Sequence, residues 1–273
     1  MTRIGWIALT SATTVVGTLF LASPTLADDL DTCGKQSGDV AIAACTRGIV
    51  SGRYSGHSLA ILYNNRGVNY RNKGDLDRAV ADYSEAVKID PKYAKPYYNR
   101  CVAYYEQNDY DHTIAECTEA IRLDSKYAPA FDERANAYSD KGDHDRAVAD
   151  YNESIQLEPN NPVTLNNRCD ELLILRQPLA ALADCNESLR QRPNHANTLM
   201  HRGNAYLAAG QLDKARADYE GALRQKPKDM WSLYGLGYIK KRQGDENGGD
   251  ADVAAAKAIN SNIAKAFDLR GIK

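Results

Sequence analysis

Residues 63–91 read YNNRGVNYRNKGDLDRAVADYSEAVKIDP, and residues 131–159 read FDERANAYSDKGDHDRAVADYNESIQLEP, two periods of 34 residues further on. The same residue types return in the same columns through five successive stretches of the chain. The first stretch supplies these columns as Tyr63, Arg66, Gly67, Tyr70, Gly74, Ala79, Tyr83, Ala86 and Pro91. A fixed period of this length predicts a solenoid, in which each unit buries its apolar face against its neighbours.

The columns resemble those of the tetratricopeptide repeat (TPR) family, with small residues at repeat positions 8, 20 and 27, aromatic residues at 4, 11 and 24, and proline at 32. The resemblance covers residues 60–229 without a gap, as repeats 60–93, 94–127, 128–161, 162–195 and 196–229. It implies an all-α fold, a right-handed α-solenoid of helix-turn-helix units. Each repeat then has a first helix, a glycine- or asparagine-containing turn and a second helix, which is capped by Asp75, Asp109, Asp143 or Asp245 where one is present.

The two ends of the chain depart from the repeat. Residues 1–27 resemble a signal peptide, because Arg3 is the only charge before residue 28 and a largely apolar run precedes Thr25-Leu26-Ala27. A retained membrane anchor is the competing interpretation. Residues 28–59 are expected to form an N-terminal cap, joined to the first repeat by residues 51–58. Residues 230–273 are expected to form a degenerate sixth repeat, an interruption at Gly248-Gly249, and a capping helix over 250–269.

Without residues 1–27 the chain carries 33 basic and 36 acidic residues, because Arg3 leaves with the segment. This balance gives no electrostatic footprint for nucleic acid or for an anionic membrane surface. We therefore expect no nucleic-acid partner and, once the signal segment is cleaved, no membrane insertion.

The six cysteines fall into pairs under the TPR resemblance. Positions 8 and 24 face each other across the two helices of a repeat, and they hold Cys101 with Cys117 and Cys169 with Cys185. Cys33 and Cys45 then remain for each other. Buried free thiols are the alternative, but disulfides fit an exported chain because they persist in oxidising compartments. The expected location is periplasmic or secreted.

Position 7 is arginine and position 23 is acidic in all five repeats. We predict a structural ladder of ion pairs between the two helices of each repeat, because a half-buried guanidinium needs a carboxylate. An anion-binding stripe is the alternative, which the matched acids disfavour. The pairs are Arg66–Asp82, Arg100–Glu116, Arg134–Asp150, Arg168–Asp184 and Arg202–Asp218.

Catalytic signatures are missing from the sequence. It has no glycine-rich phosphate loop, no His-Glu-x-x-His and no nucleophile elbow, and its five histidines occupy unrelated repeat positions. We expect no enzyme activity, no cofactor and no metal site.

The concave surface is the expected place of function, and the resemblance places positions 2, 5, 6, 9, 12 and 13 of the first helices on it. Its early half is polar, with Asn65, Asn99 and Asn167 at the position from which some TPR grooves hold a peptide backbone, and with Asp132 and Glu133. Its later half is apolar and contains Leu173, Ile174, Met200, Leu207, Trp231, Tyr234 and Tyr238. Either a partner covers this apolar strip or the C-terminal helix folds back and buries it.

The sequence thus favours a non-enzymatic adaptor or scaffold, which holds a peptide or partner segment in its groove outside the cytoplasm. A structural subunit of an envelope assembly and an auxiliary binder of exported glycan are the alternatives. The identity of the partner is not encoded in any motif.

Overall fold

The computed structural model describes residues 26–272, and this range contains only helices and no strand. The helices are α1 (Leu26–Lys35), α2 (Gly38–Val50), α3 (Gly56–Asn72), α4 (Leu76–Ile89), α5 (Ala94–Glu106), α6 (Tyr110–Leu123), α7 (Ala128–Asp140), α8 (His144–Leu157), α9 (Pro162–Ile174), α10 (Pro178–Gln191), α11 (Ala196–Ala208), α12 (Leu212–Gln225), α13 (Met230–Arg242), α14 (Glu246–Ile259) and α15 (Ile263–Leu269). The predicted signal segment, residues 1–27, lies outside the described residues except for the first two residues of α1.

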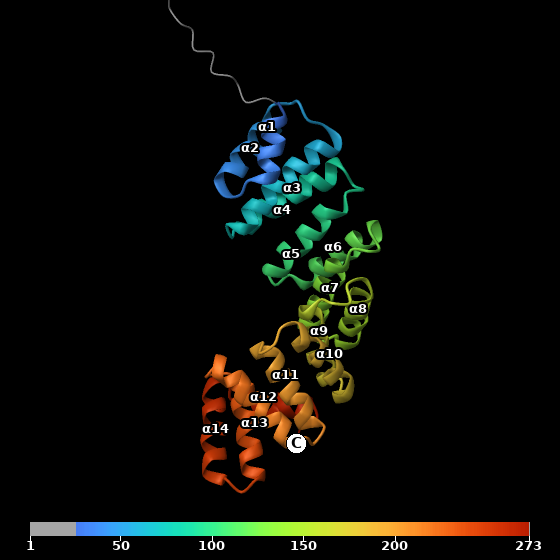
Figure 1. Cartoon of the computed structure of the whole chain (residues 1–273). Helices are drawn as coiled ribbons and strands as arrows, with labels where there is room; N and C mark the ends of the chain where they lie inside the picture. The colour runs from blue at the N-terminus through green and yellow to red at the C-terminus, as the bar shows by residue number, and fades with distance from the viewer. Residues whose placement is uncertain (1–25, 273) are drawn as a thin grey trace, which may run out of the picture.

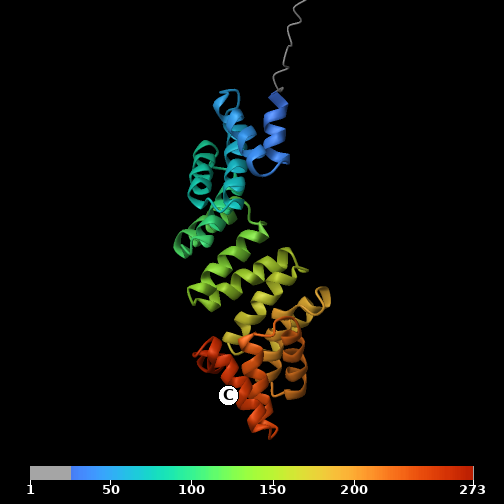
Figure 2. The ribbon, with the colours of Figure 1, turned by 90° about the vertical axis from the view of Figure 1, so that its left-hand side faces the viewer.

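Consecutive helices form antiparallel hairpins that stack along one axis, with α1 at one end and the α13–α14 hairpin at the other (Figures 1 and 2). The first helix of a hairpin contacts the first helix of the next, as α3 contacts α5 and α11 contacts α13. Each second helix packs on its own first helix and on the next one, as α4 packs on α3 and α5. The first helices therefore make up the inner, concave layer. This arrangement confirms the predicted all-α right-handed solenoid.

The turns inside the hairpins follow the predicted cap chemistry. Gly74 takes a left-handed backbone conformation (φ 78°) and lets the chain reverse. The carboxylate of Asp75 then accepts a hydrogen bond from the backbone N–H of Arg78, in the first turn of α4. Asp109, Asp143 and Asp245 accept equivalent bonds at the starts of α6, α8 and α14. Helix α10 lacks such a side-chain cap, and its first residue is Pro178, which is tolerated in the first helical turn.

The N-terminal segment is more ordered than a loose cap. Helices α1 and α2 form a hairpin whose core contains Cys33, Ala44 and Cys45, and Leu62 of α3 completes this core. Helix α3 begins at Gly56, inside the segment 51–58 that was expected to be a connection. Its extra first turn places Leu59 against the same core, and this burial accounts for the difference.

The prediction for the C-terminal end is wrong in one respect. The expected helix over 250–269 is two helices, α14 and α15, and Gly248 and Gly249 lie inside α14. A Cβ atom on Gly249 would stand 2.8 Å from the carbonyl oxygen of Gly237 in α13, and one on Gly237 would stand 2.7 Å from that of Gly249. These glycines permit close packing of α13 on α14, so the sixth repeat is a complete hairpin followed by the short helix α15.

Candidate partner-binding groove

The predicted arginine ladder lies behind the groove. In each of the five repeats the arginine of the first helix meets the acid of the second; Arg134, for example, donates from Nε and Nη2 to the two oxygens of Asp150, both at 2.7 Å. Arg100 differs and donates from Nη2 to both oxygens of Glu116. Only 8–16% of the acidic side chains is exposed. The matched carboxylates leave no arginine of this column free for an anionic ligand.

Each ladder arginine also reaches the preceding hairpin, a link that sequence reasoning missed. Nη1 of Arg134 donates to Thr118 in α6, and the other four arginines make the same bond. Their acceptors are Thr46, Ser84, Asn152 and Asn186, for Arg66, Arg100, Arg168 and Arg202 respectively. One guanidinium thus joins three helices from two hairpins. The acceptor Thr46 gives α2 the role of a second helix, so α1–α2 acts as a further unit of the stack.

The sixth hairpin replaces the arginine of the ladder. Leu236 occupies the arginine column and is buried, while Asp252 keeps the acidic column. Lys240, one turn after Leu236, supplies the cation at 2.8 Å from Asp252. The ladder therefore ends before the C-terminal hairpin.

The three expected cysteine pairs are the three that the structure brings to bonding distance. Cys33 and Cys45 are at 2.12 Å, Cys101 and Cys117 at 1.97 Å, and Cys169 and Cys185 at 2.11 Å. They cross-link the α1–α2, α5–α6 and α9–α10 hairpins, which alternate with hairpins that have no disulfide. In the intervening hairpins a tyrosine fills the same place; a Cβ atom on Gly67 would stand 2.7 Å from the ring of Tyr83.

The predicted apolar half of the groove is mostly core. Leu173 is fully buried among α9, α10 and α11, and Met200 and Leu207 are 7% and 6% exposed. These three residues are therefore not an exposed docking strip, and that part of the prediction is wrong. Ile174 is half-buried, and Tyr238 lines a separate cleft of about 430 Å³ between α13 and α14.

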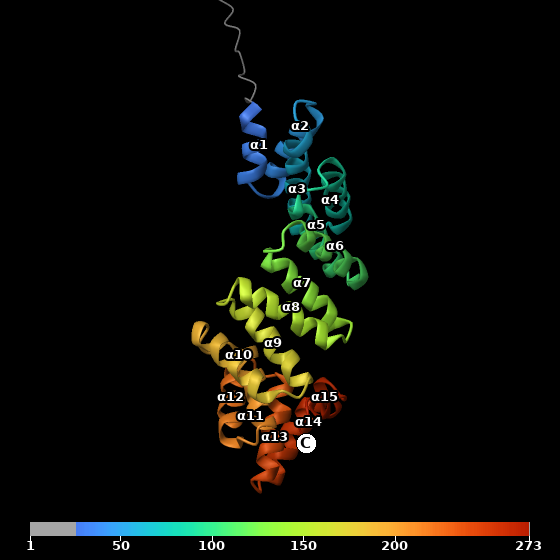
Figure 3. The same cartoon turned by 90° about the vertical axis from the view of Figure 1, so that its right-hand side faces the viewer.

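The remaining apolar residues of the strip are covered by the end of the chain. Helix α15 folds back beside α13 (Figure 3). Its Phe267, 2% exposed, stacks on Trp231 with ring centroids 5.3 Å apart and packs against Tyr234 at 4.7 Å. The C-terminal segment thus covers the Trp231 and Tyr234 part of the strip, as in the second of the two alternatives that the sequence left open.

The same segment delivers a cation into the groove. The Arg270 guanidinium lies 4.3 Å from the Trp231 ring centroid and donates to both carboxylate oxygens of Asp170 at 3.0–3.2 Å. His201 also approaches Asp170, at 3.2 Å. Burial acts to raise the pKa of Asp170, but the charges and hydrogen bonds of His201 and Arg270 outweigh it and hold that pKa well below its usual range. Asp170 is therefore a carboxylate that binds Arg270 and lies close to His201.

The predicted asparagine row is not a free row. Asn99 is 7% exposed and donates to Asn64 in the neighbouring repeat at 2.7 Å, so its amide N–H serves the packing of α3 on α5. Asn167 donates to Asn136 at 3.3 Å, and the Oδ1 atom of Asn65 accepts from Asn64. The amides bond mainly to one another, because the shared position lies at the contact between successive first helices.

Asp132 and Glu133 stand at the centre of the groove, on α7. Asp132 accepts a hydrogen bond from Thr164 at 2.8 Å, and Glu133 accepts a long one from Asn136 at 3.4 Å. Burial raises the pKa of Glu133 to about 7, and the charges of Asp132 and Glu106 add to that effect. Near neutral pH this carboxyl is poised between its two protonation states.

A cavity of about 160 Å³ runs along the inner layer from α5 to α11. It is lined by Tyr105, Asn136, Ser139, Asp140, Tyr151, Asn167, Asp170, Glu171 and His201. Tyr105 donates to Asp140 at 2.7 Å, and Glu171 accepts from Ser139 at 2.6 Å and pairs with His144 at 2.8 Å. The lining is polar and rich in carboxylates, and it was only partly visible in the sequence because its members come from different repeat positions.

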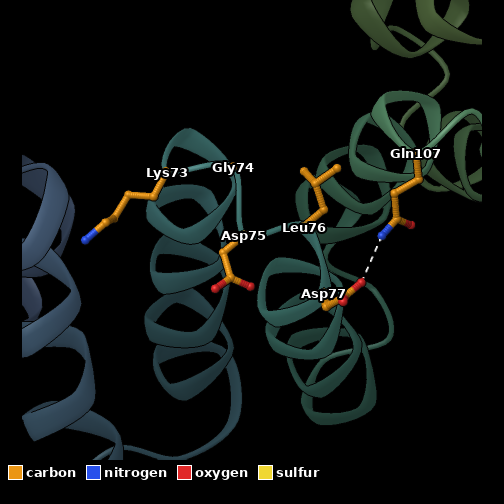
Figure 4. Close-up of a pocket in the computed structure, with 6 residues that line it drawn as sticks. All are labelled: Lys73, Gly74, Asp75, Leu76, Asp77 and Gln107. Atoms are coloured by element: carbon orange, nitrogen blue, oxygen red, sulfur yellow. Dashed lines mark hydrogen bonds between the residues drawn. The ribbon is translucent and has the colours of Figure 1, made fainter.

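A second hollow lies on the turn side of the stack and carries no site. It is lined by the turn residues Lys73 to Asp77 and by Gln107, which donates to Asp77 at 3.1 Å (Figure 4). These side chains cap and join helices. Over residues 26–272, no group of three or more His, Cys, Asp or Glu residues could hold a metal ion, and no helix is long and apolar enough to cross a membrane.

Models of the TPR repeat match residues 67–108 and 180–244, and a tetratricopeptide repeat model matches residues 128–161. Together the matches cover more than half of the sequence, and the chain belongs to the tetratricopeptide repeat family. No curated protein matches it.

Three solved structures illustrate the likeness of fold. YrrB, described as a TPR protein with an unusual peptide-binding site, is 20% identical with a TM-score of 0.57, over 66% of this chain and 93% of that one. PilF of Pseudomonas aeruginosa is 18% identical with a TM-score of 0.64, over 78% and 97%. A TPR protein of Parabacteroides merdae is 16% identical with a TM-score of 0.61, over 90% and 97%. At such identities the likeness establishes the fold alone.

Proposed function

We propose that the protein is a non-enzymatic interaction adaptor that holds a segment of a partner protein on the inner face of α3, α5, α7 and α9. One observation carries the proposal. The later part of the inner face is filled by the chain's own C-terminal segment, with Phe267 on Trp231 and Arg270 on Asp170, whereas Glu106 and Asp140 on the inner helices before it are exposed. A groove that accommodates one peptide segment of this chain has the shape to accommodate another beside it.

The open part also has the composition of a binding surface rather than of a cap. Tyr98 and Tyr105 are only half-buried, and exposed carboxylates stand at Glu106 and Asp140. Amphipathic aromatic side chains next to charges are typical of interface centres, because they offer large apolar contact area together with directional hydrogen bonds.

Export completes the proposal. The three cysteine pairs are buried and account for all six cysteines, a pattern that suits an oxidising compartment. Together with the apolar segment before residue 28, they support a periplasmic or secreted adaptor. N-terminal sequencing of the protein isolated from its cell tests the export, since a first residue near Asp28 is expected, and a retained Met1 would speak for an anchor.

Site-specific photocrosslinking tests the adaptor function. A benzoylphenylalanine at Val163, an exposed residue of the inner helix α9, should capture a partner protein from an envelope extract. The same group at Leu179, an exposed residue of the second helix α10, is the matched control and should capture little. Capture at Leu179 alone would contradict groove binding and favour a structural subunit that docks through its outer face.

A further inference from the structure

The cavity along the inner layer has two unlike ends. At the α9–α11 end, the carboxylate of Asp170 already binds the guanidinium of Arg270 and approaches His201. At the α5–α7 end, Tyr105 and Asp140 line the same cavity, and the Asp140 side chain is exposed. The cavity therefore continues from an occupied cation site into an unoccupied stretch.

Beside that stretch, the inner helix α7 carries an excess of acid, of which only Asp140 lines the cavity itself. Asp132, Glu133 and Asp140 form no ion pair within the described part of the chain. The nearby basic side chains have other partners: Arg71, whose charge also acts on Glu133, stands 3.7 Å from Glu106, and His144 lies against Glu171. Lys141, next to Asp140 in sequence, points to Asp111 at the start of α6. A cation entering from outside would thus meet three carboxyl groups that have no charged partner.

Aromatic rings accompany these acids. Tyr98 and Tyr105 lie on α5 and Glu133 and Asp140 on α7, and these two inner helices contact each other. Tyr105 additionally holds Asp140 through its hydroxyl group. An aromatic face beside a carboxylate is favourable for a Lys or Arg side chain, because the ring attracts the cation while the acid neutralises it.

The chain itself provides an example of this chemistry. Arg270 reaches the groove from a different element, lies over the Trp231 ring, and forms its hydrogen bonds with a groove carboxylate. Tyr98 and Tyr105 with Glu133 and Asp140 repeat the combination of ring and acid in the second and third repeats, before the fourth-repeat Asp170. The inner layer thus presents the same recognition elements twice, with one set already in use.

We propose that the open stretch of the groove binds a basic segment of a partner polypeptide, whose Lys or Arg side chain enters between Tyr98, Tyr105, Glu133 and Asp140. The proposal rests on the adaptor function and names the class of partner. The segment would lie along the axis on which the inner helices stack. It would end at the contact between Arg270 and Asp170, because α15 fills the groove beyond that point.

Fluorescence anisotropy with defined peptides tests this proposal on the full-length chain. The probe is a labelled twelve-residue peptide of arginine alternating with serine and alanine, and its matched control replaces each arginine by citrulline, which has nearly the same shape and no charge. The arginine peptide and a lysine version should bind, and the citrulline peptide should bind at least about tenfold more weakly. No binding of the arginine peptide, or equal binding of the citrulline peptide, would overturn the proposal.

Two variants locate the binding. Glu133→Gln with Asp140→Asn should weaken the arginine peptide at least about tenfold. Both variants are measured at pH 8, where Glu133 is largely ionised. Asp39→Asn with Asp111→Asn then removes about the same net charge at exposed positions outside the groove and should change binding less than about twofold. Equal effects of the two variants would reduce the interaction to nonspecific charge attraction and overturn the proposal. Asp140→Lys, at an exposed position that folding tolerates, should abolish binding and guards against misfolding of the double variant.

The outcome can be separated from that of the adaptor function. If Val163 crosslinks a partner whose binding survives replacement of its basic residues by glutamine, the adaptor function stands and the basic-segment proposal fails. If the crosslinker captures no partner at Val163 or at Leu179, and the arginine peptide still binds through Glu133 and Asp140, the basic-segment site stands without an established partner.

Discussion

The arginine ladder can be tested by a double-mutant cycle on Arg134 and Asp150. The changes are Arg134→Leu, Asp150→Leu and both together. Leucine is the natural choice, because Leu236 occupies the arginine column in the sixth hairpin and is only 8% exposed there.

The magnitudes follow from burial. Only 9% of the Asp150 side chain is exposed, and Arg134 satisfies both of its oxygens, so Arg134→Leu should lower the free energy of unfolding by about 3–5 kcal/mol. The lost bond from Arg134 to Thr118 adds about 1 kcal/mol at most. Asp150→Leu should cost about 1–3 kcal/mol, since the longer arginine side chain can turn toward water. The double variant should be about 2–3 kcal/mol more stable than the sum of the two single losses, and this difference is the coupling energy.

Urea unfolding followed by far-ultraviolet circular dichroism measures the cycle, with the disulfides intact in every variant. Because a solenoid unfolds through coupled units, the four curves are best fitted together with a nearest-neighbour model. The control is the same cycle on Glu119 and Arg122, an exposed pair within α6, for which the coupling should stay below about 0.5 kcal/mol. Two harmless single variants of the Arg134–Asp150 pair, or a double variant as unstable as the sum of both, would refute a structural ladder.

Three further outcomes are expected. Replacing Cys101 and Cys117 by alanine should lower the free energy of unfolding by about 3 kcal/mol, as measured by urea unfolding, and an unchanged midpoint would contradict a disulfide there. Glu133→Gln should leave the free energy of unfolding unchanged near pH 4 and raise it by up to about 3 kcal/mol at pH 8. The pKa of Glu133 is 4.5 in the unfolded chain and about 7 in the folded one, so ionisation of the wild-type carboxyl destabilises the fold increasingly as the pH rises between these values. Parallel pH profiles of the melting temperature for the two proteins would contradict this. Leu173→Asp should lower the melting temperature by on the order of 10 °C, and an unchanged melting temperature would argue for an exposed strip. In a chain whose other tryptophan is replaced by phenylalanine, Trp231 should emit blue-shifted, quencher-protected fluorescence without any partner, and solvent-like emission would argue for exposure.

The repeat period made the hairpins and the ladder predictable, because every column of the period has one structural role. The α1–α2 hairpin escaped this reasoning since it is out of phase. Cys33 and Cys45 are 12 residues apart, against 16 in the other pairs, and Thr46 precedes its arginine by 20 residues instead of 16. A shorter turn and a longer connection hide the unit from any search at a fixed spacing.

The candidate site was less predictable than the fold. A repeat position tells which face of a helix a residue occupies, but not what the chain later places on that face. Leu207 and Trp231 hold groove positions and are nevertheless covered, because α15 returns over them with Phe267. The contact between Arg270 and Asp170 joins residues 100 positions apart, and no local pattern encodes it. The sequence placed Glu133 in the groove, but its raised pKa follows from burial, which the repeat position does not encode.

The alternation of the three disulfides affects how the molecule can come apart. Up to α10, every hairpin without a disulfide lies between two hairpins that have one. Local unfolding of such a hairpin is therefore limited by a cross-linked hairpin on each side. Beyond α10 the α11–α12 and α13–α14 hairpins follow each other with no cysteine, and the arginine column has ended by Leu236. Hydrogen exchange should therefore be fastest, and proteases should cut first, at this C-terminal third, and losing it would uncover Asp170 by withdrawing Arg270 from the groove.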